Sequence, residues 1–182
     1  MPEQRQIPRL APNQPFPAYS YVPGRFPHPM SDPRGHSFGI KPQRPDAPDP
    51  DHWRLCRPYL YGMDLFNHGY YWEAHEVWEG LWHACGRSGQ TGHFLKGLIH
   101  LAAAGVKVRQ GIPAGVKSHS RRAAELFRQT AEATGTEDAR FLGLRLGDLI
   151  RYVQEVAVAP IPDAAAEESV VTTVFDFVLS PA

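Results

Sequence analysis

The residues best suited to chemistry lie between positions 66 and 82, where aromatic rings and titratable side chains are concentrated. This stretch holds three of the four tryptophans of the chain, together with two histidines and three glutamates. A surface helix rarely carries so many large rings, and a core helix rarely carries so many ionisable groups. The stretch therefore predicts one wall of a polar pocket in a helical protein.

Within this stretch, His75 and Glu79 are four residues apart, so on a helix they lie one above the other. Such a pair can supply two ligands to a metal ion, or it can act as an acid and a base. We therefore predict His75 and Glu79 as catalytic residues and as metal ligands, with Glu76 in a secondary catalytic role. Trp72 and Trp82 flank the pair and are expected to bind the ligand. The alternative is that His75 and Glu79 form a hydrogen bond that only stabilises the helix.

The other polar residues of this helix are expected to face solvent. At about 100° per residue, Glu76 and His83 point further from the core side than His75 does, and Glu73 points further still. We interpret Glu73 as a surface charge.

A second polar stripe lies on the apolar segment 92–109. His93, Lys96, His100 and Lys107 follow one line of this segment. Polar groups on a buried helix need partners, because an unpaired one costs about 1–3 kcal/mol. The stripe of the preceding helix is the expected partner, and Lys96 and His100 are predicted to bind the ligand.

The N-terminal part adds His28 and His36, which stand among prolines and glycines. We predict that His36 also binds the ligand. Together with His75, His100 and Glu79 of the two helices, His28 and His36 offer enough nitrogen and oxygen ligands for zinc, manganese or iron. A divalent metal is therefore the expected cofactor. The two lysines of the second stripe favour an anion such as phosphate or carboxylate instead, because cations repel a metal ion.

Composition divides the chain near residue 49. Thirteen of the 18 prolines lie within the first 50 residues, which excludes helix over most of this part. We expect a proline-rich arm at 1–48, disordered over 1–15 and packed on the bundle through its aromatic side chains over 16–39. A helical bundle domain is expected at 49–160. The C-terminal segment 161–182 is extended or a short helix, and for 170–179 we favour the extended form.

Periodicity and turn residues predict the helices of the bundle. Asp49-Pro50 is typical of a helix start, and Pro58 should kink this helix or restart it. Thr134 to Glu137 matches a capping box that opens the last helix. The expected fold class is all-α, a compact bundle of four to five helices wrapped by the arm. The helices are expected at 49–67, 70–84, 92–109, 114–134 and from Thr134 to about Val156.

Composition also narrows the classes of function. Lys and Arg number 19, as do Asp and Glu, so no long-range field draws the chain to nucleic acid or to an anionic membrane. The basic stretch 117–122 is expected to be a solvated helix face. Cys56 and Cys85 suit a reducing compartment, and no apolar run is long enough to span a membrane. We expect a cytoplasmic protein with a small-molecule ligand and no nucleic-acid or membrane partner; its oligomeric state is open.

Two strings resemble a small, mostly bacterial family described as domain of unknown function 309. They are F-N-x-G-Y-Y-W-E-A-H-E-x-x-E-x-x-W at 66–82 and F-L-K-G-L-I at 94–99, and the resemblance covers about residues 60–130. It implies an all-α fold with a polar centre at His75, Glu76 and Glu79, but no activity. Family members resemble one another in having glutamine at the position of His100, which favours His75 and Glu79 as the centre.

These residues together predict a small enzyme or ligand-binding protein whose pocket lies between the helices at 70–84 and 92–109. If the site is catalytic, the mixture of His, Glu and Lys suits hydrolysis of a small anionic substrate, assisted by a metal ion or by acid and base. The alternative is a non-catalytic helical interaction module in which the His/Glu/Trp cluster is structural. The sequence leaves both open.

Overall fold

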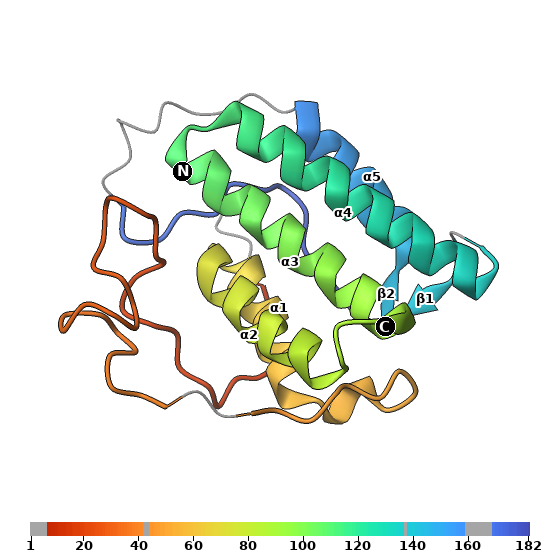
Figure 1. Cartoon of the computed structure of the whole chain (residues 1–182), viewed down its shortest axis with the longest axis horizontal. Coiled ribbons are helices and arrows are strands. Elements are labelled where there is room, and N and C mark those ends of the chain that lie inside the picture. Colours follow the sequence, from red (N-terminus) through yellow and green to blue (C-terminus); the bar gives the residue numbers. More distant parts are fainter. Residues whose placement is uncertain (1–6, 42–43, 137, 159–168) are drawn as a thin grey trace.

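The computed structural model describes residues 7–41, 44–136, 138–158 and 169–182, and these are mostly helical. The helical class is therefore confirmed, with a two-stranded hairpin added to it (Figure 1). A short 3-10 helix, η1 (Trp53–Leu55), precedes α1 (Arg57–Asn67), α2 (Tyr71–Ala84), α3 (Gly89–Gln110) and α4 (Pro113–Thr134). Strands β1 (Arg140–Phe141) and β2 (Leu144–Arg145) follow, and α5 (Leu146–Val158) is the last element.

The start of the first helix differs from the expectation. Asp49 does not begin an α-helix, because its carboxylate instead accepts hydrogen bonds from the backbone N–H of Asp51 and the His52 ring, both at 2.9 Å. Only the single turn of η1 follows. The helix restarts at Arg57 with Pro58 in its first turn, where a missing N–H is tolerated, as the position of Pro58 predicted.

The capping box expected to open the last helix is wrong. Thr134 is the last residue of α4, and its hydroxyl donates backwards to the carbonyl of Ala131 at 2.8 Å. Gly135, with a φ of 91°, then ends α4 in the left-handed region. Glu137, the other end of the expected box, lies outside the described residues. A hairpin is inserted before α5, and its two-residue turn at Leu142 and Gly143 has φ of 48° and 81°, as a type I′ turn requires.

Helix α3 lies between α2 and α4, and α5 packs on the other side of α4 (Figure 1). Two of its glycines make this central position possible. A Cβ at Gly97 would lie 2.5 Å from the Phe127 ring of α4, and a Cβ at Gly105 would lie 2.6 Å from the Tyr71 ring of α2. The rings of both neighbours therefore rest directly on the backbone of α3.

The N-terminal segment contacts α1 through Arg9, Leu10 and Ala11. The buried carboxylate of Asp64 accepts hydrogen bonds from the backbone N–H groups of Leu10 and Ala11, both at 2.8 Å, and from Arg9 Nε at 3.0 Å. Ala11 itself is buried in the core. The disorder expected for residues 7–15 is therefore wrong, because a buried carboxylate needs these donors; residues 1–6 lie outside the described chain.

The described tail, residues 169–182, forms neither helix nor strand. Its ends are tied to the rest of the fold by hydrogen bonds. Ser20 N–H donates to the Val170 carbonyl at 2.9 Å, and Asn67 exchanges two hydrogen bonds with the backbone of Leu179 at 2.8 and 2.9 Å. In the part of the chain that is described, no helix combines the length and the apolar character needed to cross a membrane.

Replacing Gly97 by alanine should destabilise the protein, because the buried Phe127 ring cannot leave the place of the new methyl group. We expect a loss of about 1–3 kcal/mol in the free energy of unfolding, measured by urea denaturation. Gly80→Ala is the matched control. A Cβ at Gly80 meets only Pro45 at 3.7 Å, so the higher helix propensity of alanine should add up to about 1 kcal/mol. Equal effects of the two substitutions would contradict the packing of α3 described above.

Candidate functional site

The rotation of α2 is set by its buried aromatic side. Trp78 is fully buried, and its indole lies where a Cβ at Gly62 of α1 would stand, 2.3 Å from Nε1. At about 100° per residue, this places His75 and Glu79 on the flank of the buried side and Glu76 beyond them. All three are partly exposed. His75 and Glu79 were predicted on this flank, whereas Glu76 was expected to face solvent.

His75, Glu76 and Glu79 come together in the structure. Each offers a ligand atom, and these atoms lie within 4.8 Å of one another. His75 Nδ1 is 3.2 Å from Oε1 of Glu76, which is within ion-pair distance. The contact does not have the geometry of a hydrogen bond, and Nδ1 is buried without any hydrogen-bond partner. The imidazole of His75 therefore lies beside two carboxylates, and its Nδ1 has an unused hydrogen-bonding position.

A pair of histidines lies on the neighbouring helices. Nδ1 of His100 on α3 is 3.0 Å from Nδ1 of His119 on α4. Burial is the main cause that lowers the pKa of His100 to about 4, and the charges of His119 and Lys96 lower it further. Burial, followed by the charge of Lys107, also lowers the pKa of His119. Both rings are therefore neutral at physiological pH.

The histidine pair also interacts electrostatically with His75 of α2. The charge of His75 contributes to the lowered pKa of both His100 and His119. Lys96, predicted to bind the ligand, lies over the ring of Trp82 with its Nζ 4.0 Å from the ring centroid. The structure thus puts acidic groups on α2 beside a neutral imidazole pair and lysines on α3.

His36 lies elsewhere. Its Nε2 is 3.0 Å from the Glu73 carboxylate, which also accepts the backbone N–H of Tyr21 at 2.8 Å. Trp72, the other predicted ligand-binding residue, packs edge-on against the rings of Tyr21 and His28. These residues hold the N-terminal segment to the outer side of α2.

The interpretation of Glu73 as a surface charge is wrong. Its side chain is only 5% exposed, and one carboxylate oxygen, Oε2, is buried without a hydrogen-bond partner. By the helical repeat Glu73 lies on the flank of α2 that faces away from His75 and Glu79, and the segment that carries Tyr21 and His36 covers that flank. A periodicity within one helix contains no information on such a cover.

His119 is the residue of this region that sequence reasoning missed. It lies in the basic stretch 117–122, which was expected to be solvated, yet it is half-buried and its neighbour Ser120 is buried. A usable signal was present, because Val116, Ser120 and Ala123 follow the buried side of α4 at helical spacing. His119 stands beside that line.

The comparisons with known proteins agree with the resemblance seen in the sequence. The model of a domain of unknown function, DUF309, matches residues 59–118, about a third of the chain. The matched part runs from α1 to the second turn of α4, so it contains His75, Glu76, Glu79 and His100 and ends one residue before His119. No curated protein matches the chain.

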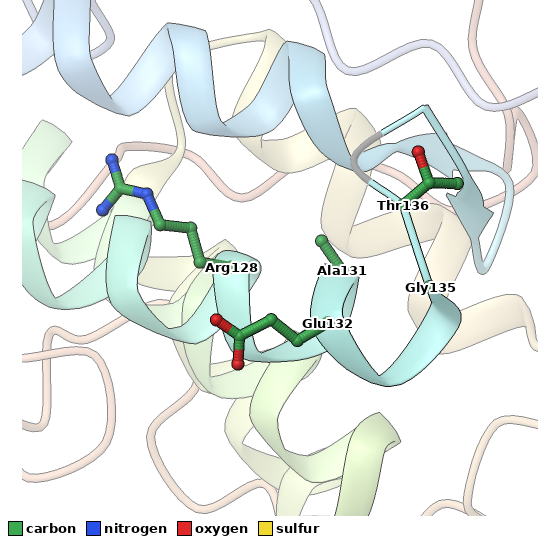
Figure 2. A pocket seen from close by; sticks show the side chains of 5 residues that line it. All are labelled: Arg128, Ala131, Glu132, Gly135 and Thr136. Atoms are coloured by element: carbon green, nitrogen blue, oxygen red, sulfur yellow. The ribbon is translucent and has the colours of Figure 1, made fainter.

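A surface hollow of about 250 Å³ lies at the other end of α4, lined by Arg128, Ala131, Glu132, Gly135 and Thr136. Figure 2 shows the Arg128 and Glu132 side chains reaching outwards from the helix. The hollow begins more than two turns beyond His119 along α4 and contains no histidine. It is not part of the candidate site.

Glu73 and Glu76 provide a direct test of burial on α2. Glu73→Ala should lower the free energy of unfolding by about 3 kcal/mol, because it leaves His36 and the Tyr21 N–H buried without their acceptor. Glu76→Ala removes a carboxylate with 37% exposure and should change stability by less than about 1 kcal/mol. Urea denaturation of both variants measures the difference. A mild effect of Glu73→Ala would show that the covering segment is not held by this carboxylate.

Stability should fall as the pH is lowered from about 6.5 to 4. In this window the unfolded chain, in which His100 has its ordinary pKa of about 6.5, takes up a proton that the folded state does not bind. The full shift corresponds to about 3 kcal/mol, and solvent screening of the half-buried ring reduces it to about 1–2 kcal/mol. His100→Gln should flatten the dependence in urea denaturation at pH 7, 6 and 5. An unchanged slope in this variant would assign the effect to other groups.

Proposed function

We propose that this chain binds a divalent transition metal through His75, Glu76 and Glu79 and uses it to hydrolyse a small anionic substrate. The observation that carries the proposal is that each of the three residues offers a ligand atom within 4.8 Å of the others, and that His75 Nδ1 is buried there without a hydrogen bond. An imidazole and two carboxylates form a set that suits zinc, manganese or iron.

The spacing supports a shared ion. Metal–ligand bonds to nitrogen and oxygen are about 2.0–2.2 Å long, so two ligands of one ion stand at most about 4.4 Å apart. Ligand atoms within 4.8 Å of one another reach this range through small rotations of the Glu76 and Glu79 side chains. Both glutamates are partly exposed, so these rotations are not hindered by core packing.

The residues divide the chemistry of hydrolysis between them. A bound divalent ion would lower the pKa of a coordinated water molecule, to about 7 where the ion is zinc. His75 would hold the ion at the flank of the core. A carboxylate oxygen of Glu76 or Glu79 that is not bound to the ion would accept the proton of that water. The lysines of α3 favour a substrate with negative charge.

The remaining parts of the chain support this site. We propose that the proline-rich arm, residues 1–48, wraps the bundle of residues 49–160 and does not form a separate unit. The contacts of Ala11 with the core and of His36 with Glu73 support this arrangement. Cys56 and Cys85 are both free thiols, which suits work in the cytoplasm.

Elemental analysis of protein purified without chelator tests the metal. We expect about one zinc, manganese or iron ion per chain in the wild type and none in His75→Ala, with the free energy of unfolding changed by less than about 2 kcal/mol. His93→Ala, which removes an exposed histidine of α3, is the matched control and should keep the ion. A wild type without metal, together with a His75→Ala variant that unfolds, would support the interaction module, in which the cluster is structural.

A further inference from the structure

The imidazole pair of His100 and His119 is a second cluster, which the proposed metal centre does not use. The two rings come from different helices and meet at their Nδ1 atoms, 3.0 Å apart. Among the groups outside the pair, Lys96 acts most strongly on His100 and Lys107 on His119, each through its positive charge. The pair therefore stands in a positive region of the surface.

The contact between the Nδ1 atoms determines what the pair offers to a ligand. In a hydrogen bond between two neutral imidazoles, one ring carries its proton on Nδ1 and the other accepts on Nδ1. The first ring then has a bare Nε2, and the second carries its proton on Nε2. The neutral pair thus always presents one N–H donor and one lone pair. Among the described residues neither Nε2 has a protein partner, and neither is buried.

The lysines keep their charge available. Lys107 is held by the neutral amide oxygen of Gln110 at 2.8 Å, and Lys96 lies over the Trp82 ring. Arg122 contributes less, because Glu125 pairs with it at 2.9 Å. Two cations without carboxylate partners in the described chain therefore flank one donor and one acceptor.

We infer that His100 and His119 form an oxyanion subsite that recognises a phosphate group. A phosphate that keeps one proton has oxygens that accept from the Nε2–H and a P–OH that donates to the bare Nε2. The inference deepens the proposed function, on which its place in catalysis rests, by naming a phosphorylated small molecule as the substrate. The lysines supply the attraction, and the imidazole pair supplies the selectivity.

Sulfate separates this subsite from simple charge attraction. It resembles phosphate in shape and charge but has no proton near neutral pH, so its oxygen would face the bare Nε2 with no hydrogen between them. Unpaired groups of this kind are the means by which binding sites reject close analogues. A merely cationic surface would bind both anions alike.

Isothermal titration calorimetry on chelator-treated protein tests the subsite without the metal. Inorganic phosphate, glycerol phosphate and sulfate are titrated at about pH 6, where about half of a phosphomonoester keeps its proton and His100, with a pKa of about 4, is neutral. We expect phosphate and glycerol phosphate to bind at least about tenfold more tightly than sulfate. His119→Gln should weaken phosphate binding about tenfold, while Lys117→Gln, which removes an exposed charge of the same helix, should change it less than about twofold.

Each result of these titrations supports or overturns the subsite, the phosphorylated substrate or the metal centre. Equal binding of phosphate and sulfate by the wild type, or no binding of phosphate, overturns the subsite, and neither result needs a variant that folds. Binding of phosphate without glycerol phosphate overturns the phosphorylated substrate. If phosphate binds selectively but elemental analysis finds no metal, the subsite stands and the metal centre fails. If the metal is found and phosphate does not bind, only the subsite fails.

Discussion

The rotation of α2 about its own axis is the constraint on which the candidate site depends, and the contact between Trp78 and Gly62 sets it. The Trp78 indole is fully buried against the α1 backbone at a place where any side chain would collide with it. The indole N–H finds no hydrogen-bond partner there, so shape and apolar burial determine the contact. With Trp78 fixed, the helical repeat brings His75, Glu76 and Glu79 to the border between core and solvent. Ionisable groups at such a border are shielded enough to interact strongly and open enough to reach a ligand.

On another side of α2, the N-terminal segment that covers the helix changes the environment of a glutamate from solvent to protein interior. Glu73 and Glu76 are three residues apart on one helix, yet the first is buried under the N-terminal segment and the second meets water. The same principle applies to α1, where Asp64 is buried and satisfied by three donors from Arg9, Leu10 and Ala11. Both carboxylates bind the N-terminal segment to the helices, and this interaction orders a part of the chain that has no helix or strand.

Local signals in the sequence predicted α2, α3 and α4 well, because apolar stripes and glycine ends are properties of neighbouring residues. The restart at Pro58 follows from a missing N–H, and the central place of α3 follows from its glycines. The same reasoning failed at Thr134, where a capping pattern occurs beside a glycine that ends the preceding helix, and only the backbone conformation decides between them. It predicted His75 and Glu79 as a pair because they stand one turn apart on a helix, and the family resemblance added Glu76. It missed His119, because the basic residues around it suggested a solvated face, and its contact with His100 on another helix leaves no mark in the sequence.

The central helix α3 brings together two sides of the candidate site that differ in charge. Its close packing against α2 at Gly105 and against α4 at Gly97 brings three helices together within a narrow width. Glu76 and Glu79 lie on the α2 side, and lysines accompany the imidazoles on the α3 and α4 side. Burial is the main reason that the pKa of His100 falls to about 4, and repulsion by His119 and Lys96 lowers it further. The neutral state of the pair, with its single donor and single acceptor, is thus maintained by burial and reinforced by the same lysines that would attract an anion. Recognition by hydrogen-bond pattern and attraction by charge are therefore consequences of one arrangement.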